Sequence, residues 1–396
     1  MFIILLDIMR RKALNTRAGY YMQNTYGYKS FVPASLPPNP EILLDWEMQE
    51  LLSQADRKLG RLDGITEILP NPDLFLAMYV NKEALLSSQI EGTQASFVDV
   101  LEFDESNSEA KVNTADVVNY VKALRYGLDR IKSLPLSLRL IREIHKVLIE
   151  GTRGSEKDPG EFRKTQNWIG PQGSTPSTAT FVPPDVKTME AAMNELELFL
   201  YDSDSHLPPL IKIALIHAQF ETIHPFLDGN GRMGRLLITF WLCQQKILSQ
   251  PLLYLSYYFK QNRTEYYDRL MDVRNKGAWE AWIKFFLKGV AEVSDESIYT
   301  AKEIISLKNS YSKALYELDS NNSNFQRLLD FLFDNPIITR KQVCEALGVS
   351  NPTAGILLGV FCDLQILEDF TPHRQRNKKY SFGKYISVLN RGTEPL

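Results

Sequence analysis

The segment HPFLDGNGRMGR, residues 224–235, gathers side chains that could carry out acid–base and phosphate chemistry. It opens with His224, and an unperturbed imidazole has a pKa of ~6.5, so that it accepts a proton at neutral pH. Three glycines follow at GxGxxG spacing, and glycine lets backbone N–H groups come close to phosphate oxygens. The segment therefore combines a candidate general base with a candidate phosphate loop.

The charged residues of this segment suit a nucleoside triphosphate. Arg232 and Arg235 carry guanidinium groups whose geometry matches phosphate. Asp228 offers a hard oxygen ligand for a Mg²⁺ ion that bridges phosphates. The pattern predicts that a helix begins at about Gly231, and the N-terminus of a helix favours an anion. We therefore expect a nucleotide polyphosphate site with His224 beside it.

Two other interpretations of the loop do not fit the residues around it. GxGxxG is also the dinucleotide fingerprint, but that motif follows a strand, whereas residues 210–223 have helical periodicity. Asp228 and Asn230 are spaced as at the start of an EF-hand loop, but Thr239 stands where the bidentate glutamate belongs. A structural role would explain a lone histidine or a lone glycine turn, but it does not explain all of these residues on one loop.

Helical periodicity flanks the loop and continues through most of the chain, so the predicted fold class is mainly α. Two extended runs around a cluster of Gly, Ser, Pro and Thr predict a hairpin at 162–184. Four prolines in residues 29–40 predict an extended arm. The segments predicted as helices are 42–65, 72–92, 117–131, 137–149, 186–200, 210–223, 236–248, 279–293 and 301–318.

The C-terminal part has its own pattern, after a polar and turn-prone stretch at 319–324. Residues 338–367 predict helix, turn, helix, and residues 367–383 predict a hairpin, which together indicate a winged helix-turn-helix domain. We therefore divide the chain into an N-terminal arm and helix (1–70), a catalytic domain (71–300), a helix and linker (301–324) and a winged helix-turn-helix-like domain (325–396).

Composition limits the class of protein. The chain has 396 residues, 44% of them hydrophobic, and a formal net charge of -3, which excludes a chain built as a whole to coat nucleic acid or an anionic membrane. Cys243, Cys344 and Cys362 form neither an even set nor a CxxC pair, so we expect no disulfide, no structural zinc and a cytoplasmic location. The apolar start, residues 1–9, is too short to span a bilayer, and its positive charges follow the apolar run, so we expect no membrane anchor or signal peptide.

The loop matches every fixed position of the Fic family signature, HPFxDGNGRxxR. The resemblance implies a helical bundle with a β-hairpin flap that transfers AMP from ATP to a Tyr, Thr or Ser hydroxyl of a target protein and releases pyrophosphate. It implies that His224 deprotonates the hydroxyl, Asp228 holds Mg²⁺, and Arg235 reaches the γ-phosphate. Asn230 and the glycine backbone would hold the α- and β-phosphates. The implied ATP-binding residues are Glu91, Asp228, Gly229, Asn230, Gly231, Arg232, Met233, Gly234, Arg235, Tyr267 and Asn275.

Two further stretches are similar to the family. GEFRKTQNWIG and TATFVPP resemble the flap, whose exposed edge pairs with an extended target segment; an ordinary surface hairpin is the alternative. EYYDRLMDVRNKG, 265–277, resembles the segment that closes over the nucleoside and indicates Tyr266 or Tyr267, with Asn275; core tyrosines are the alternative. The flap residues implied are Thr178, Ala179, Thr180 and Phe181.

The stretch SSQIEG resembles the inhibitory motif of autoinhibited family members, through Ser87, Glu91 and Gly92. Ser87 and Glu91 are four residues apart on one face of the helix predicted to start at Pro72. A carboxylate there could pair bidentately with Arg235 and occupy the guanidinium that the γ-phosphate needs. We therefore expect an autoinhibited enzyme; a solvated surface glutamate is the alternative.

Alternative functions stay open. The same site could remove AMP from a modified protein with a water positioned by Glu91. The C-terminal domain could bind DNA, but its predicted recognition helix, 351–364, lacks Arg, Lys and Gln. Its basic residues lie on the wing and could contact phosphate without sequence preference, or an acidic protein face. A protein-interaction or dimerisation module is the alternative, and a homodimer is the commonest default. The wing residues are His373, Arg374, Arg376, Lys378 and Lys379.

Overall fold

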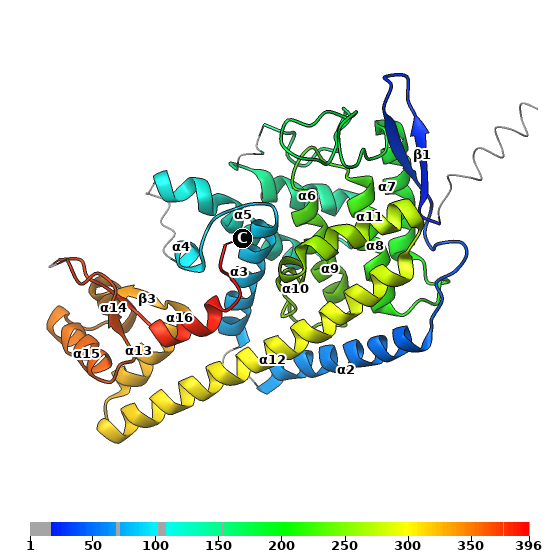
Figure 1. Cartoon of the computed structure of the whole chain (residues 1–396). Helices are drawn as coiled ribbons and strands as arrows, with labels where there is room; N and C mark the ends of the chain where they lie inside the picture. Colours follow the sequence, from blue (N-terminus) through cyan, green and yellow to red (C-terminus); the bar gives the residue numbers. More distant parts are fainter. Residues whose placement is uncertain are drawn as a thin grey trace, which may run out of the picture.

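The computed structural model shows a helical body with an elongated C-terminal extension (Figure 1). The apolar start of the chain, for which no anchor was expected, lies outside the described residues. The residues that the structure describes are 17–68, 72–101, 108–152, 154, 156–374 and 376–395.

The centre of the body is α8 (Pro209–Ile223), in which every residue from Leu210 onward is buried. A helix that is apolar on all sides must be enclosed by other elements. It packs against α7, α9, α11 and α12, and the Trp282 indole of α12 donates a 2.8 Å hydrogen bond to the backbone oxygen of Ala214. The surrounding helices are α3 (Pro72–Ile90), α4 (Phe97–Leu101), α5 (Ser108–Arg130), α6 (Leu138–Ile149), α7 (Val186–Tyr201), α9 (Asn230–Gln244), α10 (Ser256–Gln261), α11 (Arg263–Lys276) and α12 (Trp279–Leu318).

The first long helix, α2 (Trp46–Ile68), lies along α12 (Figure 1). It begins at Trp46 and not near residue 42, because Asp45 caps it by accepting a 2.9 Å hydrogen bond from the backbone N–H of Met48. The same carboxylate binds Lys284 of α12 at 2.7 Å. The cap therefore fixes both the start of α2 and its position on α12.

The arm before α2 is extended, as the prolines predicted, but part of it forms a hairpin that was not expected. Strands β1 (Gly19–Gln23) and β2 (Lys29–Pro33) pair in antiparallel fashion. The backbone N–H of Phe31 in β2 donates a 2.9 Å hydrogen bond to the oxygen of Val182. The arm thus lies against the end of the predicted flap.

The predicted hairpin at 162–184 is present only in reduced form. Ile169 and Phe181 form an antiparallel bridge with two backbone hydrogen bonds of 2.8 and 3.0 Å, and turns make up most of the chain between them. Pro171 and Pro176 cannot donate to a longer ladder because they have no N–H. The flap is therefore a loop closed by one residue pair.

One continuous helix, α12, replaces the two helices expected at 279–293 and 301–318. The residues in between are polar, which suggested a break. However, Ser294 and Ser297 are buried, and the Ser294 hydroxyl donates a 2.7 Å hydrogen bond to the oxygen of Val290 one turn earlier. A hydroxyl bonded in this way is compatible with the helix interior.

The C-terminal part follows α12 and forms the far end of the molecule (Figure 1). Its helix–turn–helix was expected, and the two helices meet at 111°. A three-stranded antiparallel sheet has the order β3-β5-β4. Neither α13 nor α16 was expected, and the winged-helix classification remains a prediction. The elements are α13 (Ser323–Asp334), β3 (Ile337–Thr339), α14 (Arg340–Leu347), α15 (Asn351–Asp363), β4 (Glu368–Asp369), β5 (Lys379–Ser381) and α16 (Gly383–Asn390).

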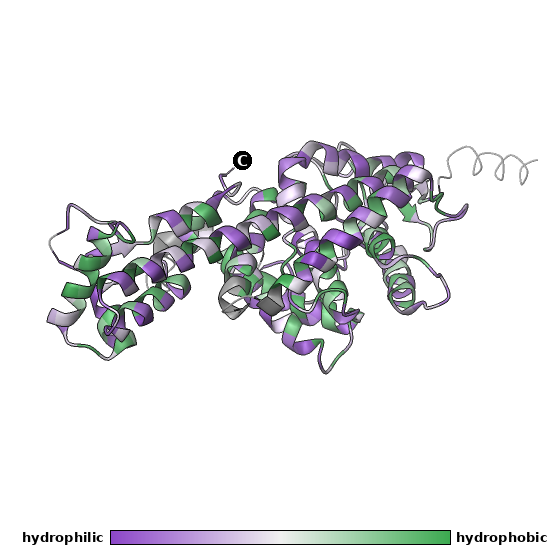
Figure 2. Cartoon of the chain, turned by 90° about the horizontal axis from the view of Figure 1, so that it is seen from below, coloured by the Kyte–Doolittle hydropathy of each residue, from purple (hydrophilic) through white to green (hydrophobic). Residues whose placement is uncertain are grey.

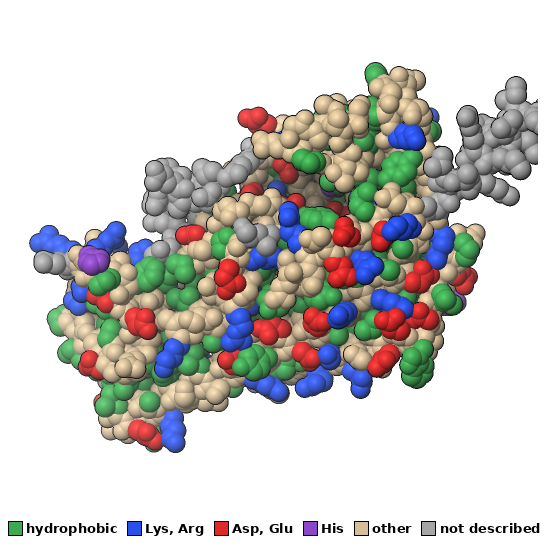
Figure 3. Space-filling view, viewed as in Figure 1, with side chains coloured by type: hydrophobic (Ala, Val, Ile, Leu, Met, Phe, Trp, Pro, Cys, Tyr) green, Lys and Arg blue, Asp and Glu red, His purple; other side chains and the backbone are tan. Residues whose placement is uncertain are grey.

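Hydrophobic and hydrophilic residues alternate in short runs along the long helices (Figure 2), as expected of amphipathic helices. Acidic and basic side chains are interspersed on the face that α2 and α12 form (Figure 3). Among the described residues, no single helix is long and apolar enough to cross a membrane, and only the bent pair α14 and α15 passes by length and composition. The apolar residues Leu357, Leu358 and Phe361 of α15 are buried within the C-terminal part.

Candidate active site

The loop between α8 and α9 begins and ends at residues with a left-handed backbone conformation. His224 ends α8 with φ of 51°, and Gly229 begins α9 with φ of 76°. The buried Asn230 side chain, next to Gly229, accepts from the N–H of Phe226 at 2.9 Å and donates to its oxygen at 2.8 Å. Asn230 therefore shapes the loop through both polar atoms of its side chain.

Residues at the start of the flap, Arg163 and Asn167, form hydrogen bonds with the backbone of the same loop. Arg163 donates from Nε to the backbone oxygen of His224 at 3.1 Å, and its backbone N–H donates to Pro225 at 2.9 Å. The Asn167 amide bridges the oxygens of His224, at 3.0 Å, and Phe226, at 2.8 Å. Sequence reasoning assigned this stretch only to the flap, because hydrogen bonds to backbone leave no spacing signature.

His145 of α6 is a second support that the sequence did not reveal. Its ring stacks on Phe226 with centroids 3.6 Å apart and an angle of 5°. Nδ1 accepts a 2.9 Å hydrogen bond from Gly160, so Nε2 carries the proton and donates to the backbone oxygen of Asp228 at 2.9 Å. Burial lowers the pKa of His145 to about 4, which keeps this neutral tautomer.

The loop and the start of α9 line a cavity of about 550 Å³. This volume is within the range of small-molecule sites. His224, Gly231 and Arg235 of the motif face it together. Several residues expected from the inhibitory motif, the flap and the nucleoside segment also line it, namely Glu91, Thr180, Phe181 and Tyr267. The structure therefore brings the candidate base, the helix N-terminus and one guanidinium into one space.

Arg235 is buried and binds the end of α3. Its Nε donates to the Ser87 hydroxyl at 2.8 Å, and its Nη2 donates to the Ser87 backbone oxygen at 2.9 Å and to Glu91 Oε1 at 2.8 Å. The pairing with Glu91 was expected to be bidentate and is not, because Ser87 takes the Nε edge of the guanidinium. Glu91 Oε1 would lie 2.2 Å from a Cβ added at Gly231, so the carboxylate sits directly on the first turn of α9.

His224 presents a neutral ring to the cavity. Burial above all, together with the guanidinium groups of Arg274 and Arg163, lowers the pKa of His224 to about 3. Its Nδ1 is buried without a hydrogen-bond partner among the described residues. The ring lines the cavity in its neutral form, which is the form that can accept a proton.

We expect the His224 ring to stay neutral as the pH falls from 8 to 5, whereas free histidine protonates near pH ~6.5. Because the unfolded chain takes up this proton first, folding should weaken as the pH falls below about 6.5. Nitrogen NMR shifts of labelled histidine, with His224→Ala to assign the signal, measure the titration. A His224 titration near pH 6.5 would show that the site is far more solvated than the structure indicates.

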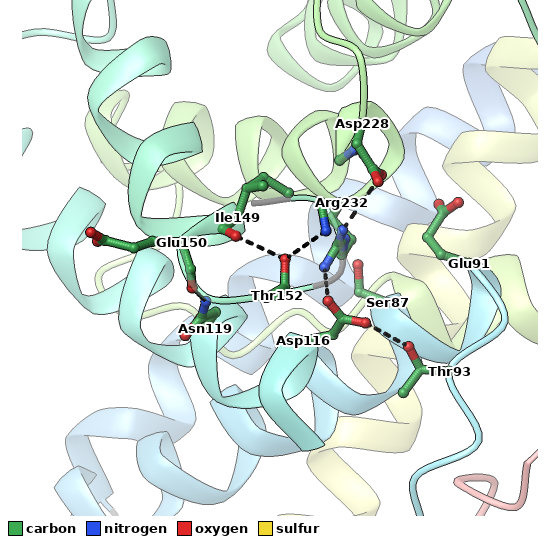
Figure 4. Close-up of polar contacts among 12 residues, drawn as sticks. Ser87, Glu91, Thr93, Asp116, Asn119, Ile149, Glu150, Thr152, Asp228 and Arg232 are labelled. Atoms are coloured by element: carbon green, nitrogen blue, oxygen red, sulfur yellow. Dashed lines mark hydrogen bonds and ion pairs between the residues drawn. The ribbon is translucent and has the colours of Figure 1, made fainter. Parts of the chain in front are cut away.

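Arg232 was expected to bind phosphate, but its side chain points away from the cavity. Its Nη1 donates to Asp116 of α5 at 2.8 Å, and its Nη2 lies 3.7 Å from Asp228 (Figure 4). Asp116 also accepts from Thr93, just after the inhibitory segment, at 3.4 Å. Arg232 therefore joins the motif loop to α5 and to the chain that follows α3.

Asp228 is 35% exposed in its side chain and is the motif's one candidate metal ligand. Lys157 Nζ lies 3.4 Å from its Oδ2, and the N–H of Gly229 donates to its Oδ1 at 2.6 Å. The described ranges contain no group of three or more His, Cys, Asp or Glu placed to hold a metal. Any ion at Asp228 would therefore need oxygens from a ligand and from water.

The other predicted site residues lie outside the cavity lining. Met233 is buried in the core, and Gly234 packs on Glu221, whose Oε1 would meet an added Cβ at 2.3 Å. Gly92, with φ of 96°, ends the α3 segment. Asn275 is exposed, and its side chain accepts from Tyr21 of β1 at 3.0 Å. The remaining residues outside the lining are Thr178, Ala179 and Gly229.

Three charged residues, Glu221, Arg263 and Arg274, line the cavity without having been predicted. Burial raises the pKa of Glu221 to about 7, and its Oε1 has no hydrogen-bond partner among the described residues. The Arg274 guanidinium lies 4.0 Å from the ring centre of Phe181 and donates to the backbone oxygen of Glu221 at 2.9 Å. Glu221 is three residues before His224 in the helical run and Arg274 adjoins Asn275, so proximity in sequence was the available signal.

Comparisons with known proteins agree with this geometry. The model of the Fic/DOC family N-terminal region matches residues 49–129, and the Fic/DOC family model matches residues 135–242. Curated relatives named protein adenylyltransferase Fic are 27% identical in Drosophila grimshawi and 28% in Aedes aegypti, each over 211 residues. These matches cover 52% of this chain but only 38% and 37% of the relatives, so the chain spans well under half of their length.

A solved structure of a Fic family protein from Desulfovibrio desulfuricans G20 has the same fold. It matches with a TM-score of 0.55 and 17% sequence identity, over 86% of this chain and 97% of that chain. At this identity the likeness concerns the fold alone.

Proposed function

This chain belongs to the Fic/DOC family, and we propose that it transfers AMP from ATP to a hydroxyl group of a target protein, with release of pyrophosphate. The observation that carries the proposal is the single cavity shared by His224, the first turn of α9 at Gly231, and Arg235. A base, an anion-binding helix end and a guanidinium are the groups that nucleotidyl transfer requires.

In the proposed reaction, His224 takes the proton of the target hydroxyl. The hydroxyl oxygen forms a bond to the α-phosphorus, the bond from that phosphorus to the bridging oxygen breaks, and pyrophosphate leaves. The pKa of His224, lowered to about 3, keeps the ring neutral at physiological pH, which is the form that a proton acceptor needs. General base catalysis of this kind contributes about 10²–10⁴ in rate.

The phosphates would lie along the start of α9. A helix leaves its first N–H groups without carbonyl partners of its own, and Gly231 has no side chain of its own to cover them once Glu91 is displaced. Arg235, at the far end of this turn, would bind the γ-phosphate. Asn230 would act by shaping the loop, and Arg232 by fixing the loop to Asp116.

Asp228 would hold Mg²⁺. The fit is consistent with that ion, which usually takes one or two protein carboxylates and keeps several waters beside substrate phosphates. Asp228 has a partly exposed carboxylate, and Lys157, at 3.4 Å, would have to give way. When bound, Mg²⁺ supplies charge neutralisation of the phosphates.

The target segment would dock on the flap. Thr180 and Phe181 line the cavity, and Phe181 is already paired with Ile169, so the open backbone edge lies before it, at 179–180. Addition of an extended segment to such an edge would align its hydroxyl with His224.

Glu91 would keep the enzyme inactive in its resting state. Its carboxylate binds Arg235 at 2.8 Å and sits on Gly231, where the phosphates would bind.

We also propose a cytoplasmic location, in keeping with the free Cys243, Cys344 and Cys362.

The proposal is tested by the position of the label in ATP. The Glu91→Gly variant is incubated with magnesium, a cell lysate and ATP labelled on either the α- or the γ-phosphate. Protein bands labelled from α-labelled ATP alone are expected. Bands from γ-labelled ATP would indicate phosphorylation and contradict the proposal. Release of AMP from the labelled bands by the native chain would favour the reverse reaction at the same site.

A DNA-binding function finds less support in the structure. The exposed residues of α15 include no basic side chain; they are Asn351, Pro352, Ile356, Gly359 and Asp363. On the wing, Lys378 is paired with Asp369 at 2.6 Å. We therefore propose no nucleic-acid partner.

A further inference from the structure

The last described residues of the chain contact the end of the inhibitory helix. Gln89, two residues before Glu91 in α3, is 1% exposed. Its side-chain amide donates to the backbone oxygen of Ala95 at 2.9 Å and to that of Thr393 at 2.8 Å. A buried amide that loses an acceptor is costly, so the contact with Thr393 stabilises this placement of α3.

The segment 391–394 is itself firmly held, which makes it an anchor for α3. Arg391 binds Glu303 of α12 at 2.9 Å and lies 3.8 Å from Glu296. Lys260 of α10 donates to the backbone oxygens of Gly392, at 3.3 Å, and Glu394. The segment therefore joins α10 and α12 to the helix that carries Glu91.

The same segment is connected to the C-terminal part through α16. Phe382 and Tyr385, at the start of α16, pack on Phe333 of α13 with ring centres 5.2 and 4.9 Å away. Only α16 separates this core from residue 391. A displacement of the C-terminal part would therefore be transmitted to the segment that holds Gln89.

We propose that residues 391–394 form a latch on the inhibitory helix, so that release of this latch frees Arg235 from Glu91 and activates AMP transfer. The proposal rests on the proposed function of the site, and it assigns the C-terminal part a regulatory role. A partner that moves the C-terminal part would activate the enzyme without touching the ATP site.

Two glycines provide a matched pair of variants. Gly392 has φ of 74°, and an added Cβ would lie 2.2 Å from the Tyr257 ring, so Gly392→Ala should displace the latch. Gly348, at the end of α14, has φ of 68° and nothing within 4 Å of an added Cβ. Gly348→Ala therefore imposes the same backbone strain in the C-terminal part but leaves the latch in place. Gln89→Met removes the amide donor at similar volume and gives a second, independent release.

The first measurement is hydrogen exchange in the full chain. We expect the amides of residues 84–92 to exchange about fivefold faster in Gly392→Ala and Gln89→Met, and at the native rate in Gly348→Ala. Native exchange in both release variants would overturn the latch. This result does not depend on AMP transfer, so it decides the latch even if the proposed function is wrong.

The second measurement is the AMP transfer rate. Gly392→Ala should raise it about fivefold, and the double variant with Glu91→Gly should be no faster than Glu91→Gly alone, because both act on one contact. A further rise in the double variant would mean that the segment acts on the active site by another route, and it would overturn the latch. If Glu91→Gly itself does not raise the rate, the proposed autoinhibition fails, and the exchange result stands separately.

Discussion

Replacing Glu91 by glycine is expected to raise the rate of AMP transfer about tenfold to a hundredfold. The carboxylate accepts a 2.8 Å hydrogen bond from Arg235 and sits on the first turn of α9. A hydrogen bond to a charged group is worth about 1.5–3 kcal/mol, and each 1.4 kcal/mol corresponds to a factor of ten. Because the Glu91 side chain is 39% exposed, the lower half of this range is expected.

The initial rate of label transfer from ATP to protein measures this effect. Glu50→Gly is the control, because it also replaces a glutamate by glycine, at an exposed position of α2 far from Arg235 in sequence. Glu91→Gln keeps the shape and the acceptor oxygen but removes the charge, so an intermediate rate is expected. Equal rates for the native chain and Glu91→Gly would remove Glu91 as the inhibitory residue.

Replacement of His224 by alanine in the Glu91→Gly background is expected to lower the rate about 10²- to 10⁴-fold. The loss follows from removal of the proton acceptor, since the Arg235 and Gly231 parts of the cavity remain. ATP affinity should change little, and calorimetric titration of ATP checks this. A variant that loses rate and affinity together would show that His224 shapes the loop and does no chemistry.

Two controls separate chemistry from backbone strain. His224→Asn retains a residue type that tolerates the left-handed backbone at φ of 51°, but it offers no comparable base. It should be as inactive as His224→Ala. His206 is an exposed histidine that is also left-handed, with φ of 45°, and His206→Ala should keep full activity.

The sequence predicted the centre of the site well because its residues are local. His224, Gly231 and Arg235 lie on one loop and one helical turn, so their spacing alone brings them to one cavity. The Ser87 and Glu91 spacing likewise placed both groups on one helix face toward Arg235. Periodicity predicted most of the helices for the same reason.

What the sequence could not predict depends on contacts between distant segments. The partner of Arg232 is Asp116, on another helix, and Arg232 does not line the cavity. The supports of the loop, Arg163, Asn167 and His145, bind backbone atoms that every residue possesses. The unbroken α12 includes the polar Ser294, whose hydroxyl bonds to the oxygen of Val290 within the helix, and the sequence does not reveal this contact.

The most direct measurement is the crystal structure of the Glu91→Gly variant with magnesium and a non-hydrolysable ATP analogue. The γ-phosphate is expected at about 3 Å from the Arg235 guanidinium, with the other phosphates along the first turn of α9 and the α-phosphorus facing His224. A triphosphate bound elsewhere, with Arg235 and the first turn of α9 free of it, would contradict a nucleotidyl transfer site in this cavity.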